Sequence, residues 1–102
     1  METIIEKCKQ TLQEHYGDQF QGLYLYGSMA RDQGDESSDI DLLVLLGKPF
    51  QPFEELRTIV NLLYPIQMDS DKLISAKPVA ADEFRQGKIH LYRVVKREGK
   101  AA

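Results

Sequence analysis

The stretch that decides the fold is LYLYGSMARDQGDESSDIDLLVLL, residues 23–46. Residues 22–26 form a short apolar and aromatic run, which is typical of a buried strand. Residues 39–46 predict a second strand, and its later positions are apolar on both faces, as in the centre of a covered sheet. The polar segment 32–38 contains a glycine and two serines and indicates a loop. The stretch therefore predicts two strands joined by a polar connection.

Apolar residues elsewhere in the chain recur at helical spacing, with one further apolar stretch that is typical of a strand. We expect helices at residues 3–16, from Pro52 onward, at 81–86 and at 89–97, a third strand at 71–79, and a frayed tail at 98–102. Alternating helices and strands within 102 residues predict a single domain, 1–102, of the α/β class.

Composition narrows the function classes. Thirteen basic and sixteen acidic residues give a net charge of −3, which disfavours strong nucleic-acid binding. A single cysteine excludes an internal disulfide and fits a reducing compartment. The longest apolar run, 42–46, has five residues, whereas a membrane-crossing helix needs roughly 20. The N-terminal residues lack a signal-peptide pattern, so we expect a cytoplasmic protein without a membrane partner.

Gly27 and Ser28 come directly after the first strand. Glycine allows a sharp turn and the close approach of a ligand, and Ser28 would begin a helix whose free N–H groups attract phosphate. Arg31, about one turn further on, could contact the same phosphates. Taken alone, the Gly-Ser pair also fits an ordinary strand-to-helix turn with serine as the helix cap. The case for a nucleotide phosphate site depends on the aspartates that open the second strand.

Asp39 and Asp41 open the second strand, two residues apart, so their side chains point to the same face. Aspartate is disfavoured inside a strand, and two carboxylates this close repel each other. A divalent cation removes that repulsion, and Mg²⁺ prefers one or two carboxylates together with substrate phosphates. The pair therefore predicts a metal-assisted phosphate site.

Together these residues resemble the polymerase-beta-like nucleotidyltransferase superfamily, whose signature is Gly-Ser, about ten residues, and Asp-x-Asp opening a strand. Here ten residues separate Ser28 from Asp39. The string YGSMAR, residues 26–31, is similar to the antitoxin-like minimal nucleotidyltransferases. The resemblance implies a small mixed sheet of three or four strands with helices packed on it. It also implies transfer of a nucleoside monophosphate, AMP from Mg-ATP or another from its NTP, with two Mg²⁺ ions for which Mn²⁺ can substitute.

The resemblance further implies a third carboxylate on the next strand, as metal ligand and base. Asp71 is favoured because it immediately precedes the apolar pair Leu73 and Ile74, and Asp69 is the other candidate. If Leu73 or Ser75 stands at the equivalent depth instead, the third ligand is absent and activity is weak or lost.

The family's usual partner is a small all-helical HEPN-domain protein, which implies a toxin–antitoxin pair. The acceptor would be a hydroxyl on that partner. The alternative is a binding module of the same fold that neutralises its partner by complex formation without turnover. An antibiotic-modifying transferase is a weaker third hypothesis. The base of the NTP, the acceptor and the choice between homo- and hetero-oligomers stay open.

Overall fold

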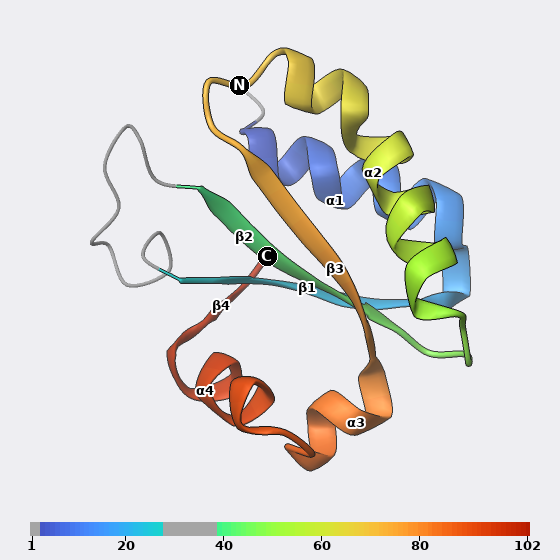
Figure 1. The fold of residues 1–102 in the computed structure, drawn as a ribbon, viewed down its shortest axis with the longest axis vertical. Helices are drawn as coiled ribbons and strands as arrows, with labels where there is room; N and C mark the ends of the chain where they lie inside the picture. The colour runs from blue at the N-terminus through green and yellow to red at the C-terminus, as the bar shows by residue number, and fades with distance from the viewer. Residues whose placement is uncertain (1–2, 28–38) are drawn as a thin grey trace.

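The computed structural model describes residues 3–27 and 39–102, and these form a four-stranded mixed sheet with helices on both faces. Figure 1 shows its strands, β1 (Phe20–Tyr26), β2 (Ile40–Leu46), β3 (Ile74–Ala80) and β4 (Lys100–Ala101). Their order is β3-β2-β1-β4; β2 is antiparallel to β1 and parallel to β3, and β4 is antiparallel to β1. The small mixed sheet predicted from the sequence is confirmed.

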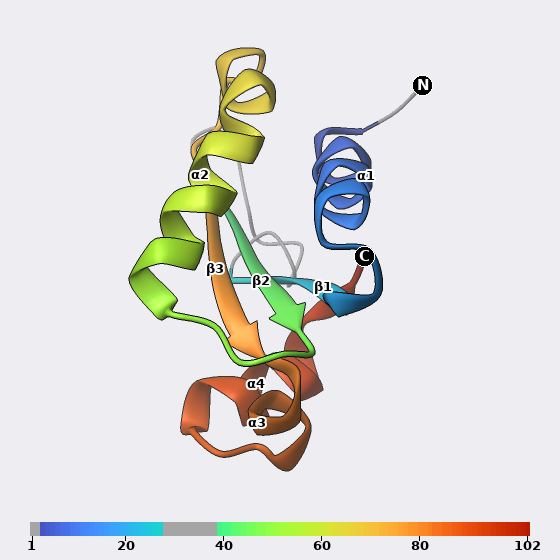
Figure 2. The ribbon, with the colours of Figure 1, turned by 90° about the vertical axis from the view of Figure 1, so that its right-hand side faces the viewer.

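Two long helices cover one face of the sheet and two short ones cover the other (Figure 2). They are α1 (Ile4–Tyr16) and α2 (Pro52–Met68) on one side, and α3 (Ala81–Gln86) and α4 (His90–Glu98) on the other, with a 3₁₀ turn at Gly17–Gln19. Thr3 and Glu6 cap α1 reciprocally, and Gln51 caps α2. Within the described residues, none of these helices is both long and apolar enough to cross a bilayer.

Strand β2 is buried on both faces, as its apolar run predicts, and it separates two cores. Ile40, Leu42 and Val44 point toward α1 and α2, whereas Leu43 and Leu45 point toward α3 and α4. The other buried side chains of the α1–α2 core are Cys8, Leu12, Leu23, Leu25, Leu46, Ile59, Leu63 and Ala76. Those of the opposite core are Val79, Ala81, Phe84 and Val95.

Strand β3 begins at Ile74, three residues later than the predicted boundary at position 71. The delay has a physical cause in the side-chain amide of Gln67, near the end of α2. Its Nε2 donates to the carbonyl of Lys72 at 2.9 Å, and its Oε1 accepts from the N–H of Ile74 at 2.7 Å. Gln67 thus satisfies backbone groups at the start of the strand and shields part of its open edge.

The C-terminal residues form β4, where the sequence predicted a frayed tail. Lys100 pairs with Leu25, Ala101 pairs with Tyr24, and the N–H of Ala102 donates to the carbonyl of Leu23 at 2.8 Å. Gly99 makes the turn out of α4. A β-carbon there would lie 2.6 Å from the Val95 carbonyl oxygen. Glycine therefore lets the chain pass close enough to α4 to reach the edge of β1.

Candidate functional site

The centre of the site is the turn at the end of β1, where Gly27 lies against Asp41 of β2. Gly27 has a φ of +77°, a conformation that residues with side chains rarely adopt. A β-carbon at this position would come 2.6 Å from Oδ2 of Asp41. Both the backbone conformation and the neighbouring carboxylate therefore require glycine at this sharp turn, and the predicted close approach of a ligand stays a prediction.

Asp39 and Asp41 stand on either side of Ile40, whose side chain is anchored in the α1–α2 core. Asp39 is exposed, and Asp41 is half-buried. Burial raises the pKa of Asp41, the charge of Asp39 raises it further, and the ammonium of Lys77 opposes the rise. The two carboxylates therefore repel each other, as their spacing predicted. The folded chain holds them together at an electrostatic cost.

The strands on both sides of β2 supply the neighbours of Asp41. In the ladder, Asp41 pairs with Tyr26 of β1 and with Ser75 of β3. Burial raises the pKa of the Tyr26 phenol, and the negative charge of Asp41 raises it further. Two hydroxyl-bearing residues, and no carboxylate, thus adjoin Asp41 among the described strand residues.

Asp71, the predicted third carboxylate, lies before β3 and not within it. It is exposed and borders a hollow with Thr3, Ile5 and Ile40, next to the start of α1. Because Ile40 points toward α1 and α2, this hollow opens on the face of the sheet opposite Asp41. The described contacts bring Asp39 and Asp41 together but leave Asp71 apart, and its role stays a prediction.

Three other predicted positions complete the sequence signature. Asp69, the second candidate for the third carboxylate, is the exposed residue that ends α2 and borders the same hollow as Asp71. Ser28 and Arg31 lie outside the described residues, so their predicted contacts with phosphate stay predictions. Of the Gly-Ser pair, the described part of the chain contains Gly27 alone.

A hollow of about 170 Å³ borders Gly27 on the α4 side of the sheet. Its walls are Tyr26 and four residues of α4, Leu91, Val94, Val95 and Glu98. Because Gly27 also lies against Asp41, the hollow is near that carboxylate, although Asp41 does not line it. Its lining is largely apolar, which suits an uncharged part of a ligand better than a phosphate.

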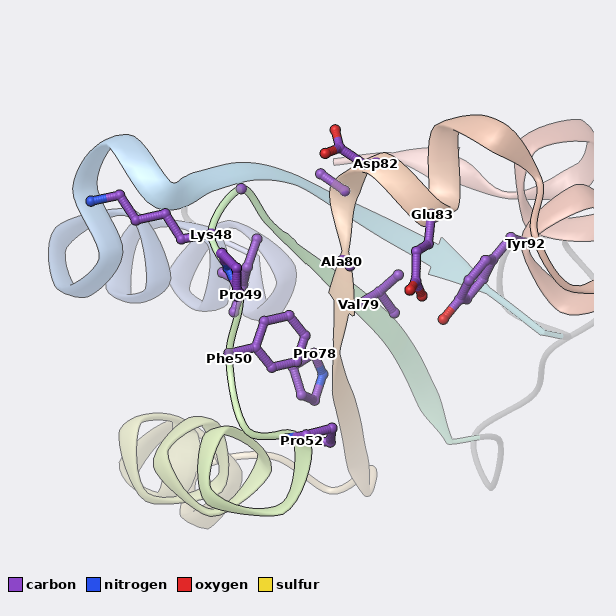
Figure 3. A pocket seen from close by; sticks show the side chains of 13 residues that line it. Lys48, Pro49, Phe50, Pro52, Pro78, Val79, Ala80, Asp82, Glu83 and Tyr92 are labelled. Atoms are coloured by element: carbon purple, nitrogen blue, oxygen red, sulfur yellow. The ribbon is translucent and has the colours of Figure 1, made fainter.

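A larger pocket of about 610 Å³ lies elsewhere, at the ends of β2 and β3 (Figure 3). Lys48 and Phe50 line it on one side, and Asp82, Glu83 and Tyr92 line it on the other. It is at the opposite end of β2 from the aspartate pair, more than about 15 Å away along the strand. Since it contains none of the signature residues, size alone does not make it the reactive site.

The donor set beside Gly27 fits a hard divalent cation. Asp41 provides a carboxylate on β2 and Asp39 provides one directly before this strand, and their mutual repulsion makes the site favourable for positive charge. Within residues 3–27 and 39–102, no three Asp, Glu, His or Cys side chains gather to hold a metal by themselves. The described part of the site is therefore suited to a cation that a phosphate ligand completes.

Sequence reasoning missed Lys77 as a neighbour of the site. It lies two residues after Ser75, so both side chains point to the same face of β3, and its charge acts on Asp41. The signal in the sequence is a lysine inside an otherwise uncharged strand, ISAKPVA. This lysine can be assigned to the neighbourhood of Asp41 only when the parallel register of β2 and β3 is known.

Comparisons with known proteins identify similarities in sequence and in fold. A family model described as Polymerase beta, Nucleotidyltransferase matches residues 6–99. No curated protein is significantly similar to the chain.

Three solved structures share its fold. A mutant of the toxin–antitoxin pair MntA-HpeT is 22% identical, with a TM-score of 0.62, over 95% of this chain and 70% of that one. A nucleotidyltransferase candidate from Sulfolobus solfataricus is 17% identical, with a TM-score of 0.56, and the match covers 96% of this chain and 71% of that one. A toxin–antitoxin structure with AMP-PNP is 21% identical, with a TM-score of 0.55, and the match covers 93% of this chain and 69% of that one. At these identities the similarity establishes the fold.

Proposed function

Because this chain belongs to the polymerase beta nucleotidyltransferase family, we propose that it transfers a nucleoside monophosphate from an NTP to a hydroxyl group of a partner protein. The observation that carries the proposal is the contact between Gly27 and Asp41. Two strands of opposite direction bring a side-chain-free turn against a carboxylate pair. That combination supplies ligands for the cation of a polyphosphate and adds no side-chain atoms at the turn.

In the proposed reaction, the acceptor oxygen attacks the α-phosphorus of the NTP. A new phosphorus–oxygen bond forms, the bond from the α-phosphorus to the bridging oxygen breaks, and pyrophosphate leaves. The acceptor proton passes to solvent or to a carboxylate of the site. Asp39 and Asp41 would hold Mg²⁺ or Mn²⁺, which offsets the charge that develops on the phosphate oxygens. Gly27 keeps the approach to the carboxylates free of side-chain atoms.

We infer that Ser28, Arg31 and Asp71 assist, with Ser28 and Arg31 at the phosphates and Asp71 as a further carboxylate. ATP is the expected nucleotide. The reaction would take place in the cytoplasm, where NTPs and Mg²⁺ are abundant. These assignments rest on the sequence signature. Substitution of each of the three residues in turn tests its role.

The expected partner is a HEPN-domain toxin, with this chain as its antitoxin. The support is the similarity of fold to two solved structures that are described as toxin–antitoxin pairs. A tyrosine hydroxyl on the toxin is the expected acceptor. Modification of that group would neutralise the toxin.

The test is incubation of the chain with a HEPN-domain protein encoded beside it, Mg²⁺ and each NTP in turn, and then intact-mass spectrometry of both proteins. We expect the partner to gain the mass of one or more nucleoside monophosphates. The Asp41→Asn variant should give no adduct, because it removes a cation ligand while keeping the shape of the side chain. Unmodified partner with all four NTPs would exclude the proposed transfer.

The second candidate is a binding module that neutralises the partner without turnover. The observation in its favour is that Ser75, and not a carboxylate, pairs with Asp41 in the neighbouring strand β3. Co-expression separates the two functions. If Asp41→Asn still protects cells from the partner, complex formation is sufficient, and if protection is lost while the complex persists, catalysis is required.

A further inference from the structure

We propose that this site holds a single divalent cation, and that the ammonium group of Lys77 supplies the positive charge that a second cation would otherwise bring to the nucleotide phosphates. The inference rests on the proposed function and specifies its metal stoichiometry. It also assigns Lys77 as a residue that positions the polyphosphate.

Few ligands are available to a second ion. Two-metal sites hold their ions about 3.5–4 Å apart and need enough anionic ligands for both. Next to Asp41, the strand positions are Tyr26 and Ser75, whose hydroxyl groups are neutral ligands. A protein usually binds one Mg²⁺ with one or two carboxylates, and phosphates and waters complete the coordination. Asp39 and Asp41 supply that number of carboxylates for one ion.

Lys77 lies on the same face of the sheet as the carboxylates. In β3, Ala76 packs into the α1–α2 core, so Ser75 and Lys77 point to the other face, which is the face of Asp41. Lys77 pairs with Leu43, one diagonal position from Asp41, within reach of a long side chain. Lys77 is exposed, so its ammonium is accessible to an incoming phosphate.

The charges of the site favour one dication over two. Asp39 and Asp41 carry two negative charges and Lys77 carries one positive charge, so these three side chains leave one net negative charge. One dication turns this into a site that attracts a polyphosphate. Glu98 also lines the hollow beside Gly27, and Arg97 lies 4.0 Å from its carboxylate. A second dication would face the ammonium group at close range, and the two would repel each other.

Lys77 therefore acts in opposite directions on two ligands. It repels a free metal ion, because both are cations, and it attracts a metal-bound polyphosphate through charge-assisted hydrogen bonds. A residue that merely stabilised the fold would change both affinities in the same direction. This difference in sign makes the role measurable without an activity assay.

The experiment measures binding of Mn²⁺ alone by electron paramagnetic resonance, and binding of preformed Mg–tripolyphosphate by calorimetry. We expect one Mn²⁺ per wild-type chain. In Lys77→Met, Mn²⁺ should bind about two- to fivefold more tightly, and Mg–tripolyphosphate about tenfold more weakly. Lys77→Arg should restore polyphosphate binding. Lys48→Met, an exposed lysine at the opposite end of β2, is the matched control and should change neither affinity.

Ser75→Asp tests the ligand position directly. A carboxylate beside Asp41 should raise the stoichiometry from one Mn²⁺ to two, and a count that stays at one would contradict the argument that the supply of ligands limits the site to one ion. Two ions bound by the wild-type chain, or a loss of both affinities in Lys77→Met, would overturn the inference and leave the proposed function intact. Wild-type protein that binds no Mn²⁺ would overturn both.

Discussion

Gly27 and Asp41 are so close that a β-carbon on residue 27 would come 2.6 Å from the Oδ2 atom of Asp41. Gly27→Ala should therefore displace this carboxylate and also force a side chain into a φ of +77°. We expect the free energy of unfolding to fall by about 1–3 kcal/mol. Mn²⁺ affinity should fall about 10- to 100-fold, the range for disturbed support of a metal ligand. Urea denaturation and Mn²⁺ titration measure the two effects.

Gly17→Ala is the matched control for that variant. Gly17 also has a positive φ, of 56°, but open space surrounds the position of its missing β-carbon. This variant should lose stability through backbone strain while keeping the Mn²⁺ affinity of the wild type. Equal losses of Mn²⁺ affinity in the two variants would mean that general destabilisation, and not the contact with Asp41, explains the effect.

Asp41→Asn should make the metal-free protein more stable while removing its affinity for cations. Burial and Asp39 raise the pKa of Asp41, so the folded state holds the ionised carboxylate less readily than the unfolded state does. A neutral amide of the same shape removes that cost, as is common at functional sites. Urea denaturation at neutral pH with a chelator present measures the gain. Asp18→Asn, at an exposed position, is the control. A less stable Asp41→Asn would contradict the electrostatic account.

Tyr16 joins α1 to α2 by donating a hydrogen bond to Oε2 of Glu55 at 2.5 Å. Burial raises the pKa of Tyr16 far above its ordinary value of 10.0, and the bond and charge of Glu55 raise it further. The folded state therefore keeps this proton longer than the unfolded state. The contribution of Tyr16 is complete below about pH 10 and is lost as the pH rises further.

Tyr16→Phe should therefore cost about 1 kcal/mol at pH 8, and its deficit relative to wild type should shrink at pH 11. Urea denaturation at both pH values measures the change. Tyr64→Phe, at an exposed tyrosine of α2, is the control and should leave the pH dependence of the wild type unaltered. A deficit for Tyr16→Phe that stays constant between the two pH values would argue against this assignment.

Gln67 protects the outer edge of the sheet, because it bonds the carbonyl of Lys72 and the N–H of Ile74. Gln67→Ala should lower the free energy of unfolding by about 1–3 kcal/mol and expose unpaired backbone at the edge of β3. We expect concentration-dependent self-association, measured by size-exclusion chromatography with light scattering. Gln13→Ala, on the exposed side of α1, should stay as monomeric as the wild type. Identical elution of both variants would show that the edge needs no such protection.

The sequence was sufficient to predict the structural features that depend on the pattern of residues close together in the chain. The apolar run after Asp41 identified β2 as a strand covered on both faces, and the spacing of Asp39 and Asp41 placed both carboxylates together. The sharp turn at Gly27 could be inferred from the end of the apolar run before it, whereas the contact of Gly27 with Asp41 could not. Each of these depends on residues within a few positions of one another.

The features that were missed depend on contacts between distant segments. The start of β3 is set by the side chain of Gln67, seven residues before Ile74. No periodic pattern of apolar residues in the sequence predicts that contact. The neighbourhood of Lys77 depends on the parallel register with β2. The pairing of Lys100 with β1 depends on the tight turn at Gly99. Propensity and periodicity do not contain this information.

The separation of the two cores by β2 has a consequence for protein engineering. The layer that contains Leu12 and Ile59 lies behind the sheet from Asp41, so its packing can be redesigned at positions away from Ile40, which anchors the aspartate pair in that layer. Random libraries restricted to that layer offer a route to heat-tolerant variants with unchanged ligand affinity. Libraries restricted to the layer around Phe84 and Val95 would instead alter the scaffold on which the carboxylates stand.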